Sequence, residues 1–268
     1  MKRGVKTLAP VAIDETAIVH ASAELDHGVE VQPFAIVGPG VRIGANTRVG
    51  PRVLIEKDTT IGTDCRLSNG AVLGTDPQDL KYEGEETVLR VGDRTVIREF
   101  ATVNRGTAAS GRTVIGSDCL LMAYCHIAHD CELGNHVVVA NATNMGGHVC
   151  IEDWATVSGM VAIHQFVRVG AHAFVGGGSR IRQDVPPYCR VVGYSSPKLY
   201  GLNSVGLERR GFSAELRRSL KRTYRILFQS GLNMSEAIER VEQDPKLSQP
   251  EVRYFLDFIR NSTRGITS

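Results

Sequence analysis

Large apolar residues recur at every sixth position along most of the chain, from Ile13 to Ile181. Three of the 29 positions in this series break the pattern: Asp79, Glu85 and Ala109. An α-helix would give a period near ~3.6 residues and a strand a period of two, and six is a multiple of two. The pattern therefore predicts short strands with a corner in every hexad, which is typical of a β-solenoid.

If three hexads close one coil, residues 18 apart lie above one another on successive coils. Coils stacked at the strand spacing of about 4.8 Å would make a rod of roughly ten coils. Glycine often follows the apolar position, and we expect these glycines to serve corners that need positive φ. They are Gly38, Gly44, Gly50, Gly62, Gly74, Gly92, Gly116, Gly134 and Gly170. The spacing leaves the handedness of the coil open.

Two polar segments interrupt the hexads, at residues 75–87 and 104–112. The hexads return in phase after each one, so both segments are expected to be loops inserted between coils. Loops on one side of a solenoid commonly carry its binding residues. We therefore expect these two loops to contribute to a site.

After Ile181 the hexads stop, and beyond residue 204 apolar residues recur at helical spacing. Ser213 is an expected N-cap, and Pro250 is well placed at the start of a last helix. We expect two domains, a β-helix at residues 1–190 and a connector with a helical domain at residues 191–268. The helices would cap the open end of the rod.

The composition is that of a globular protein, with 42% hydrophobic and 22% charged residues in a chain of 268. No apolar run approaches the ~18 residues of a membrane-spanning helix, and the run at residues 8–13 is shorter than a signal-peptide core. We therefore expect a cytoplasmic protein whose six cysteines, without a CxxC pair, are free thiols. A net charge of +2 argues against a strongly basic nucleic-acid-binding protein.

Six of the eight histidines fall between residues 126 and 172. The 18-residue spacing brings four of them to one corner of the rod, two in neighbouring columns and two beside these columns. The columns are His129, Gly147 and Gln165, then Asp130, His148 and Phe166, with His126 and His164 beside them. This predicts one cluster of titratable groups shared by three adjacent coils.

The cluster is open to three interpretations. A histidine beside an aspartate suits a general base, because the carboxylate fixes the tautomer and stabilises the imidazolium. Gly147 would bring a backbone N–H close to a developing oxyanion. Three imidazoles could instead bind zinc, as in solenoid carbonic anhydrases, or the histidines could be ordinary surface residues. We favour base catalysis by His129 with Asp130.

Several short strings, in the same order along nearly the whole chain, resemble one enzyme family. They are QDLKY (78–82), HIAHDC (126–131), GGHV (146–149), HQF (164–166), QDVPPY (183–188) and GLERRGFS (206–213). The family is the acyl-[acyl-carrier-protein]–UDP-N-acetylglucosamine O-acyltransferases, which catalyse the first step of lipid A synthesis. The resemblance implies a left-handed parallel β-helix and a homotrimer with active sites between subunits. It implies no metal and no cofactor.

The resemblance also assigns roles to individual residues. His129 would take the proton of the sugar 3-hydroxyl, Asp130 would orient it, and the amide of Gly147 would bind the thioester oxyanion. Gly177 matches the residue that closes the acyl groove and sets chain length. Substrate-binding groups would be Gln78, Asp79, Lys81, His126, His148, His164, Gln165, Asn203, Arg209 and Arg210.

The chain departs from the family at two positions. Asn104 stands where well-known members carry histidine, and its amide still donates and accepts hydrogen bonds. Val205 stands where they carry glutamate, which weakens the assignment of a nucleotide site there.

Two further features concern partners. A basic face at the start of the helical region would dock an acidic acyl carrier protein; its residues are Arg217, Arg218, Lys221, Arg222 and Arg225. Apolar residues expected to point outward would be covered in the trimer; they are Val138, Val161, Ala162 and Phe174.

Three alternatives remain. The first is another hexapeptide-repeat acyltransferase of lipid A synthesis, such as the N-acyltransferase. That enzyme has a uridine-binding domain before its rod, and the hexads here begin by residue 11, which leaves no room for such a domain. A zinc carbonic anhydrase and a non-catalytic binding solenoid are the others. Zinc analysis and an acyl-transfer assay separate them.

Overall fold

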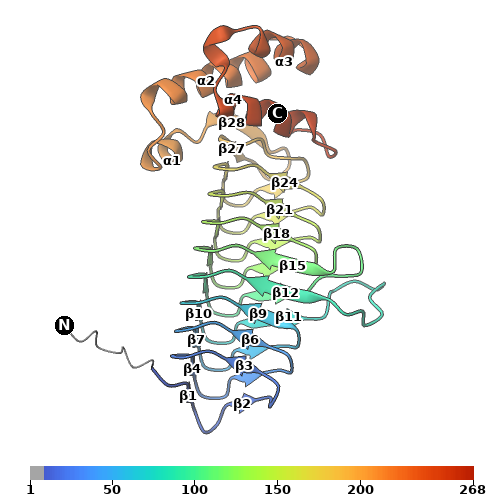
Figure 1. The fold of residues 1–268 in the computed structure, drawn as a ribbon. Coiled ribbons are helices and arrows are strands. Elements are labelled where there is room, and N and C mark those ends of the chain that lie inside the picture. The colour runs from blue at the N-terminus through green and yellow to red at the C-terminus, as the bar shows by residue number, and fades with distance from the viewer. Residues whose placement is uncertain (1–8) are drawn as a thin grey trace, which may run out of the picture.

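The computed structural model describes residues 9–268, and its main body is a rod of stacked β-coils capped by helices (Figure 1). The first eight residues of the β-helix domain expected at 1–190 lie outside the described part. Each coil contributes one short strand to each of three parallel sheets, which we name sheets A, B and C. Paired residues such as Ala12 and Glu30 are 18 apart, as the hexad spacing predicts.

Sheet A holds β1 (Ala12–Ile13), β4 (Glu30–Val31), β7 (Arg48–Val49), β10 (Arg66–Leu67), β13 (Val96–Ile97), β16 (Leu120–Leu121), β19 (Val138–Val139), β22 (Thr156–Val157), β25 (Phe174–Val175), β27 (Cys189–Val192) and β28 (Lys198–Leu202). Sheet B holds β2 (Ile18–Val19), β5 (Ile36–Val37), β8 (Leu54–Ile55), β11 (Val72–Thr75), β14 (Thr102–Asn104), β17 (His126–Ile127), β20 (Asn144–Met145), β23 (Ala162–Ile163) and β26 (Arg180–Ile181). Sheet C holds β3 (Glu24–Leu25), β6 (Arg42–Ile43), β9 (Thr59–Ile61), β12 (Val88–Val91), β15 (Arg112–Ile115), β18 (Glu132–Leu133), β21 (Cys150–Ile151) and β24 (Arg168–Val169).

The chain turns three corners per coil, which we name by the sheets they join: A–B, B–C and C–A. Both inserted loops leave from the B–C corner, one between β11 and β12 and one between β14 and β15. They project from the same side of the rod (Figure 1). The hexad residues fill the interior, and Ile55, Leu73, Leu121 and Ile127 are fully buried.

The corner glycines do not behave as the sequence led us to expect. Of the nine named, Gly74 alone has positive φ, and the left-handed position usually falls two residues later, on residues such as Asn46 and His136. The glycines are needed because coils approach closely: a Cβ on Gly44 would stand 2.7 Å from the carbonyl carbon of Gly62. The expectation that they supply positive φ is therefore wrong for eight of the nine.

The helical end consists of α1 (Ser204–Arg209), α2 (Ala214–Gln229), α3 (Met234–Glu242), a 3₁₀ turn at Pro245–Leu247 and α4 (Pro250–Arg260). Ser213 caps α2 through a bond from the Leu216 amide, and Pro250 begins α4, as predicted. The hexads stop at Ile181, but β27 still joins sheet A and pairs antiparallel with β28. Within the described chain, no helix could span a membrane.

Candidate active site

His129 and Asp130 occupy the B–C corner that follows β17, between the two inserted loops below and the helical cap above. The amide of His148 donates to the carbonyl of His129 at 3.0 Å, and the amide of Phe166 donates to that of Gly147 at 3.1 Å. These bonds stack the corner residues of three successive coils. The two columns predicted from the 18-residue spacing are therefore present.

The imidazole of His129 is hydrogen-bonded to a buried carboxylate. Its Nδ1 lies 2.7 Å from Oδ2 of Asp130, whose side chain has 0% exposure against 13% for His129. Asp130 also accepts from the amide and hydroxyl of Thr107, at 3.0 and 2.7 Å, and from the hydroxyl of Ser110. Both donors come from the second inserted loop.

These contacts determine the protonation of the pair. Burial acts to raise the pKa of Asp130, but hydrogen bonds from Ser110, His129 and Thr107 outweigh it and hold that pKa below its usual value. The ionised carboxylate only accepts, so Nδ1 of His129 carries the proton and Nε2 keeps its lone pair. The pair is arranged as a base with its orienting group.

Gly147 lies directly over the imidazole of His129. A Cβ at this position would stand 2.7 Å from Nε2, so only glycine leaves the space above the base open. Among the described residues, no hydrogen bond uses the N–H of Gly147. An amide in this position is available to a negatively charged oxygen.

Two other histidines of the cluster contact neighbouring coils. His148 stacks on Phe166 at a ring distance of 4.4 Å and meets the ring of His129 edge-on at 5.3 Å. Nδ1 of His126 bonds the hydroxyl of Thr102 at 2.8 Å. Burial, followed by the charge of His129, lowers the pKa of His126, which favours its neutral form.

The donor set at this corner bears on the metal interpretation. Ligand atoms of His129, Asp130 and His148 all lie within 4.8 Å of one another. However, both oxygens of Asp130 already accept hydrogen bonds, from Thr107, Ser110 and His129. The geometry therefore suits proton transfer better than metal coordination.

The first inserted loop brings its candidate residues to the same corner. Gln78 and Lys81 are exposed and Asp79 is half-buried, with its carboxylate accepting from the amide of Lys81 at 3.0 Å. Asn104 supports this loop from the coil above, since its amide donates to the hydroxyl of Thr75 and the carbonyl of Asp76, both at 2.9 Å. Asn104, which stands where well-known family members carry histidine, therefore stabilises the start of this loop.

His164 and Gln165 lie on the coil above Gly147 and are exposed. Nη2 of Arg264, from the C-terminal segment, lies 3.1 Å from Nδ1 of His164. The helical cap therefore reaches down to this part of the column.

The remaining substrate-binding candidates lie elsewhere. Asn203, Arg209 and Arg210 line a cavity of about 600 Å³ over sheet A, which Val205 also borders. Asn203 caps α1 and donates to the carbonyl of His172 at 3.0 Å. The guanidinium of Arg210 lies over Trp154, 5.3 Å from its ring centre, at the C–A corner. One copy of the chain does not bring this group to His129.

Gly177 occupies the third corner, A–B, and is exposed. Gly178, not Gly177, has the positive φ of that corner. A Cβ on Gly177 would stand 3.3 Å from the carbonyl oxygen of Gly159 on the coil below. The backbone conformation at position 177 therefore does not require glycine, although a side chain there would need a small shift of the Gly159 carbonyl.

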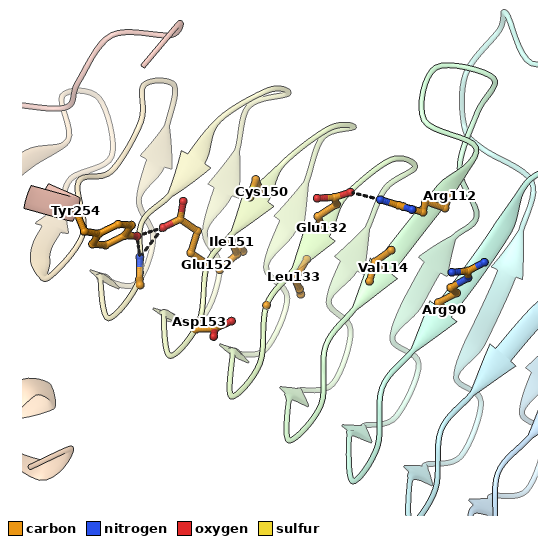
Figure 2. A pocket seen from close by; sticks show the side chains of 12 residues that line it. Arg90, Arg112, Val114, Glu132, Leu133, Cys150, Ile151, Glu152, Asp153 and Tyr254 are labelled. Carbon is orange, nitrogen blue, oxygen red and sulfur yellow. Dashed lines mark hydrogen bonds and ion pairs between the residues drawn. The ribbon is translucent and has the colours of Figure 1, made fainter. Parts of the chain in front are cut away.

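Figure 2 shows a further cavity, of about 620 Å³, on sheet C beneath α4. Its charged groups are largely paired: Arg112 lies 3.6 Å from Glu132, and Glu152 bonds Arg168 at 2.9 Å and also Tyr254. None of the residues predicted to form the site lines it. We therefore place the candidate site at the B–C corner.

The sequence did not reveal Thr107, Ser110, Arg105 or Trp154 as functional neighbours. A weak signal exists for the first two, because they are hydroxyl residues in an insertion at the corner that carries His129.

One residue predicted to point outward points inward in the structure. Val161 is 1% exposed, since it is the small apolar residue two positions before Ile163 and points into the core.

Comparison with known proteins agrees with the rod and the helical cap. Residues 40–75 and 112–147 match the family model of the bacterial transferase hexapeptide (six repeats), and residues 184–267 match "Udp N-acetylglucosamine O-acyltransferase; Domain 2". The solved UDP-N-acetylglucosamine acyltransferase from Bacteroides fragilis shares 43% identity, with a TM-score of 0.93 over 96% of this chain and 100% of that chain. The solved UDP-N-acetylglucosamine acyltransferase from Francisella novicida shares 37% identity, with a TM-score of 0.91 over 95% of this chain and 93% of that chain.

These matches define a hexapeptide-repeat acyltransferase with a left-handed parallel β-helix and a C-terminal helical domain. Two curated relatives are named acyl-[acyl-carrier-protein]–UDP-N-acetylglucosamine O-acyltransferase. The relative from Paracidovorax citrulli is 52% identical over 95% of this chain and 98% of its own length. The relative from Anaeromyxobacter dehalogenans is 46% identical over 96% of this chain and 100% of its own length. The chain belongs to this family of acyltransferases.

Proposed function

We propose that the protein transfers an acyl chain from acyl carrier protein to the 3-hydroxyl of UDP-N-acetylglucosamine, the first step of lipid A synthesis. The observation that carries this proposal is the buried Asp130 carboxylate bonded to Nδ1 of His129, with Nε2 facing the space beneath Gly147. The names of the relatives supply the substrates.

The geometry supports the following reaction. Nε2 of His129 removes the hydroxyl proton, and the sugar oxygen attacks the thioester carbonyl carbon. The N–H of Gly147 donates to the oxyanion that forms, and Asp130 stabilises the imidazolium. The C–S bond then breaks, and the imidazolium returns its proton to the departing thiolate of the carrier. Base catalysis of this kind contributes about 10² to 10⁴ in rate.

The remaining candidates would hold the substrates. Gln78, Asp79 and Lys81 would act from the first loop, two coils below the base, and His126, His148, His164 and Gln165 would act from the coil of the base and the two coils above it. Asn203, Arg209 and Arg210 would bind the nucleotide; the buried Nη1 of Arg210 has no hydrogen-bond partner among the described residues. Gly177 would limit the acyl chain.

We propose a homotrimer because the two groups of candidates lie at different corners of one chain. A second copy would place its C–A corner, with Asn203 and Arg210, against the B–C corner of the first. Exposed apolar residues along the A–B corner also suit burial between copies; they are Phe34, Phe100, Tyr124 and Met160, with 45% to 72% exposure.

The basic face of α2 would receive the acidic carrier protein. Two of its residues already have carboxylate partners, since Arg217 lies 3.2 Å from Glu208 and Arg222 lies 2.6 Å from Asp244. Arg218, Lys221 and Arg225 are therefore the cations we expect the carrier to contact.

Two further proposals concern organisation and location. The β-helix domain at 1–190 and the helical domain at 191–268 are supported by two separate apolar clusters, one inside the rod and one among the helices. A cytoplasmic location is supported by six cysteines that are all free thiols.

The decisive experiment is transfer by the purified full chain from 3-hydroxyacyl carrier protein to UDP-N-acetylglucosamine, with the acylated nucleotide identified by mass. His129→Ala is the matched control. Product that requires the carrier, the nucleotide and His129 supports the proposal. No product from active carrier, or stoichiometric zinc whose removal abolishes activity, overturns it in favour of a binding solenoid or a carbonic anhydrase.

A further inference from the structure

Arg105 is a buried arginine one coil below His129, at the same corner. Its side chain is 2% exposed, although arginine is rarely buried without several partners. Nη1 donates to the carbonyl of Gly74 at 2.7 Å, and Nη2 donates to the carboxylate of Asp76. Both partners lie where the chain leaves β11 to form the first loop.

A third partner lies at the far side of that loop. Nε and Nη2 of Arg105 donate to the hydroxyl of Tyr82, at 3.2 and 3.0 Å, and the guanidinium lies 5.6 Å from the centre of the Tyr82 ring. The hydroxyl of Tyr82 in turn donates to the carbonyl of Glu85 at 3.1 Å. One guanidinium therefore holds both ends of the segment that carries Gln78, Asp79 and Lys81.

The residues after Arg105 bind the catalytic carboxylate. Thr107 and Ser110 donate to Asp130, and the chain between them and Arg105 passes through Gly106. A Cβ on Gly106 would stand 2.6 Å from the Cα of Arg112, so the base of this second loop is closed tightly. A single short segment thus connects the first loop with the orienting carboxylate of the base.

We propose that Arg105 is a positioning residue that fixes the first loop relative to the His129–Asp130 pair and so sets the affinity for the sugar nucleotide. The inference rests on the proposed function, in which the first loop binds the sugar. Arg105 contacts neither the base nor the reacting atoms, and acts through Tyr82 and Asp76. Lysine cannot replace it, because its single ammonium group lacks the planar fork of donors with which the guanidinium bonds Gly74, Asp76 and Tyr82 together.

The test compares Arg105→Lys and Tyr82→Phe with the wild type. Arg42→Lys is the matched control, because it makes the same change in an exposed pair, 3.2 Å from Glu24 on sheet C. For each protein we would measure kcat, the KM for UDP-N-acetylglucosamine and the KM for acyl carrier protein. Amide hydrogen exchange of residues 76–87 gives a readout that is independent of activity.

Loss of hydrogen bonds to a charged group predicts a rise of about tenfold to a hundredfold in the KM for the sugar nucleotide of Arg105→Lys. The KM for the carrier should change less than about twofold, and the loop amides should exchange faster. Tyr82→Phe should show the same pattern to a smaller extent. It also provides the test if Arg105→Lys does not fold.

Unchanged loop exchange with an unchanged KM for the nucleotide would overturn the role of Arg105. A fall in kcat alone, or an equal rise in both KM values, would also overturn it, since either result indicates a general structural defect. If the wild type itself gives no product, the proposed function fails, and the exchange measurement still decides whether Arg105 holds the loop.

Discussion

The backbone of Gly147 passes over the imidazole of His129, so close that a methyl group at position 147 would overlap the ring. The two residues are 18 apart and belong to consecutive coils, joined by the bond from the His148 amide to the His129 carbonyl. The distance between base and amide is thus fixed by coil stacking.

Gly147→Ala should abolish most activity, because the added Cβ fills the space above Nε2 and displaces the amide. Removing one oxyanion donor costs about 10² to 10³ in kcat. The substitution should also lower the melting temperature, and that loss should disappear in the double variant with His129→Ala, which removes the overlapping ring. Equal destabilisation in both backgrounds would contradict this account of the clash.

His129→Ala should lower kcat by about 10² to 10⁴ with little change in folding, because its side chain lies at a corner outside the core. Asp130→Asn should cost less, since an amide still bonds the imidazole but no longer stabilises its charge. Steady-state kinetics of the purified variants provide the measurement. More than a tenth of wild-type activity in His129→Ala would exclude it as the base.

Gly177→Met should shift the preferred donor towards shorter chains. The position is exposed and free of positive φ, so methionine needs only a small shift of the Gly159 carbonyl, and its side chain would occupy the end of the proposed groove. Each methylene lost from burial is worth about 0.8 kcal/mol, or nearly fourfold in binding. Initial rates with carriers of graded chain length test this, and an unchanged profile in an active variant removes Gly177 from the mechanism.

The protein in solution should have about three times the mass of its 29.1 kDa chain. Light scattering during gel filtration measures this directly. Tyr124→Glu places a charge in the exposed A–B column, beside Phe100, with which Tyr124 stacks at 5.3 Å, and should weaken assembly. A monomer in dilute buffer would refute the trimer and leave the two candidate groups apart, at different corners of one molecule.

His172 should make stability depend on pH below neutrality. Burial, followed by the charge of Arg210, lowers its pKa to about 4 against the contribution of Asp153. Unfolded histidine takes up a proton near pH ~6.5, so the unfolded state binds more protons between that pH and about 4, and stability falls as the pH falls.

His172→Phe should reduce this loss of stability while keeping the aromatic stack between Trp154 and Tyr188. Melting temperatures at pH 7 and pH 5 for both proteins provide the comparison. The same decrease in the variant as in the wild type would show that other groups cause it.

The rod and its columns followed from the sequence because one period, repeated over 29 positions, fixes both the strand pattern and which residues stack. The contacts of Asp130 with Thr107 and Ser110 could not be predicted in this way, because the inserted loop does not follow the six-residue period. Handedness came from the family resemblance alone. The spacing did not predict that Arg210 lies at a different corner from His129 either, because Arg210 follows the last hexad and its position depends on the packing of the helical end.

Corner residues allow this fold to change its chemistry while keeping its interior. Asp130, His148, Trp154 and Met160 all adopt the same left-handed backbone conformation, although their side chains differ in charge, size and polarity. Each projects away from the hexad residues that hold the coils together. A lineage could therefore acquire a new substrate by exchanging one column of corners, and inherit the stacked interior without alteration.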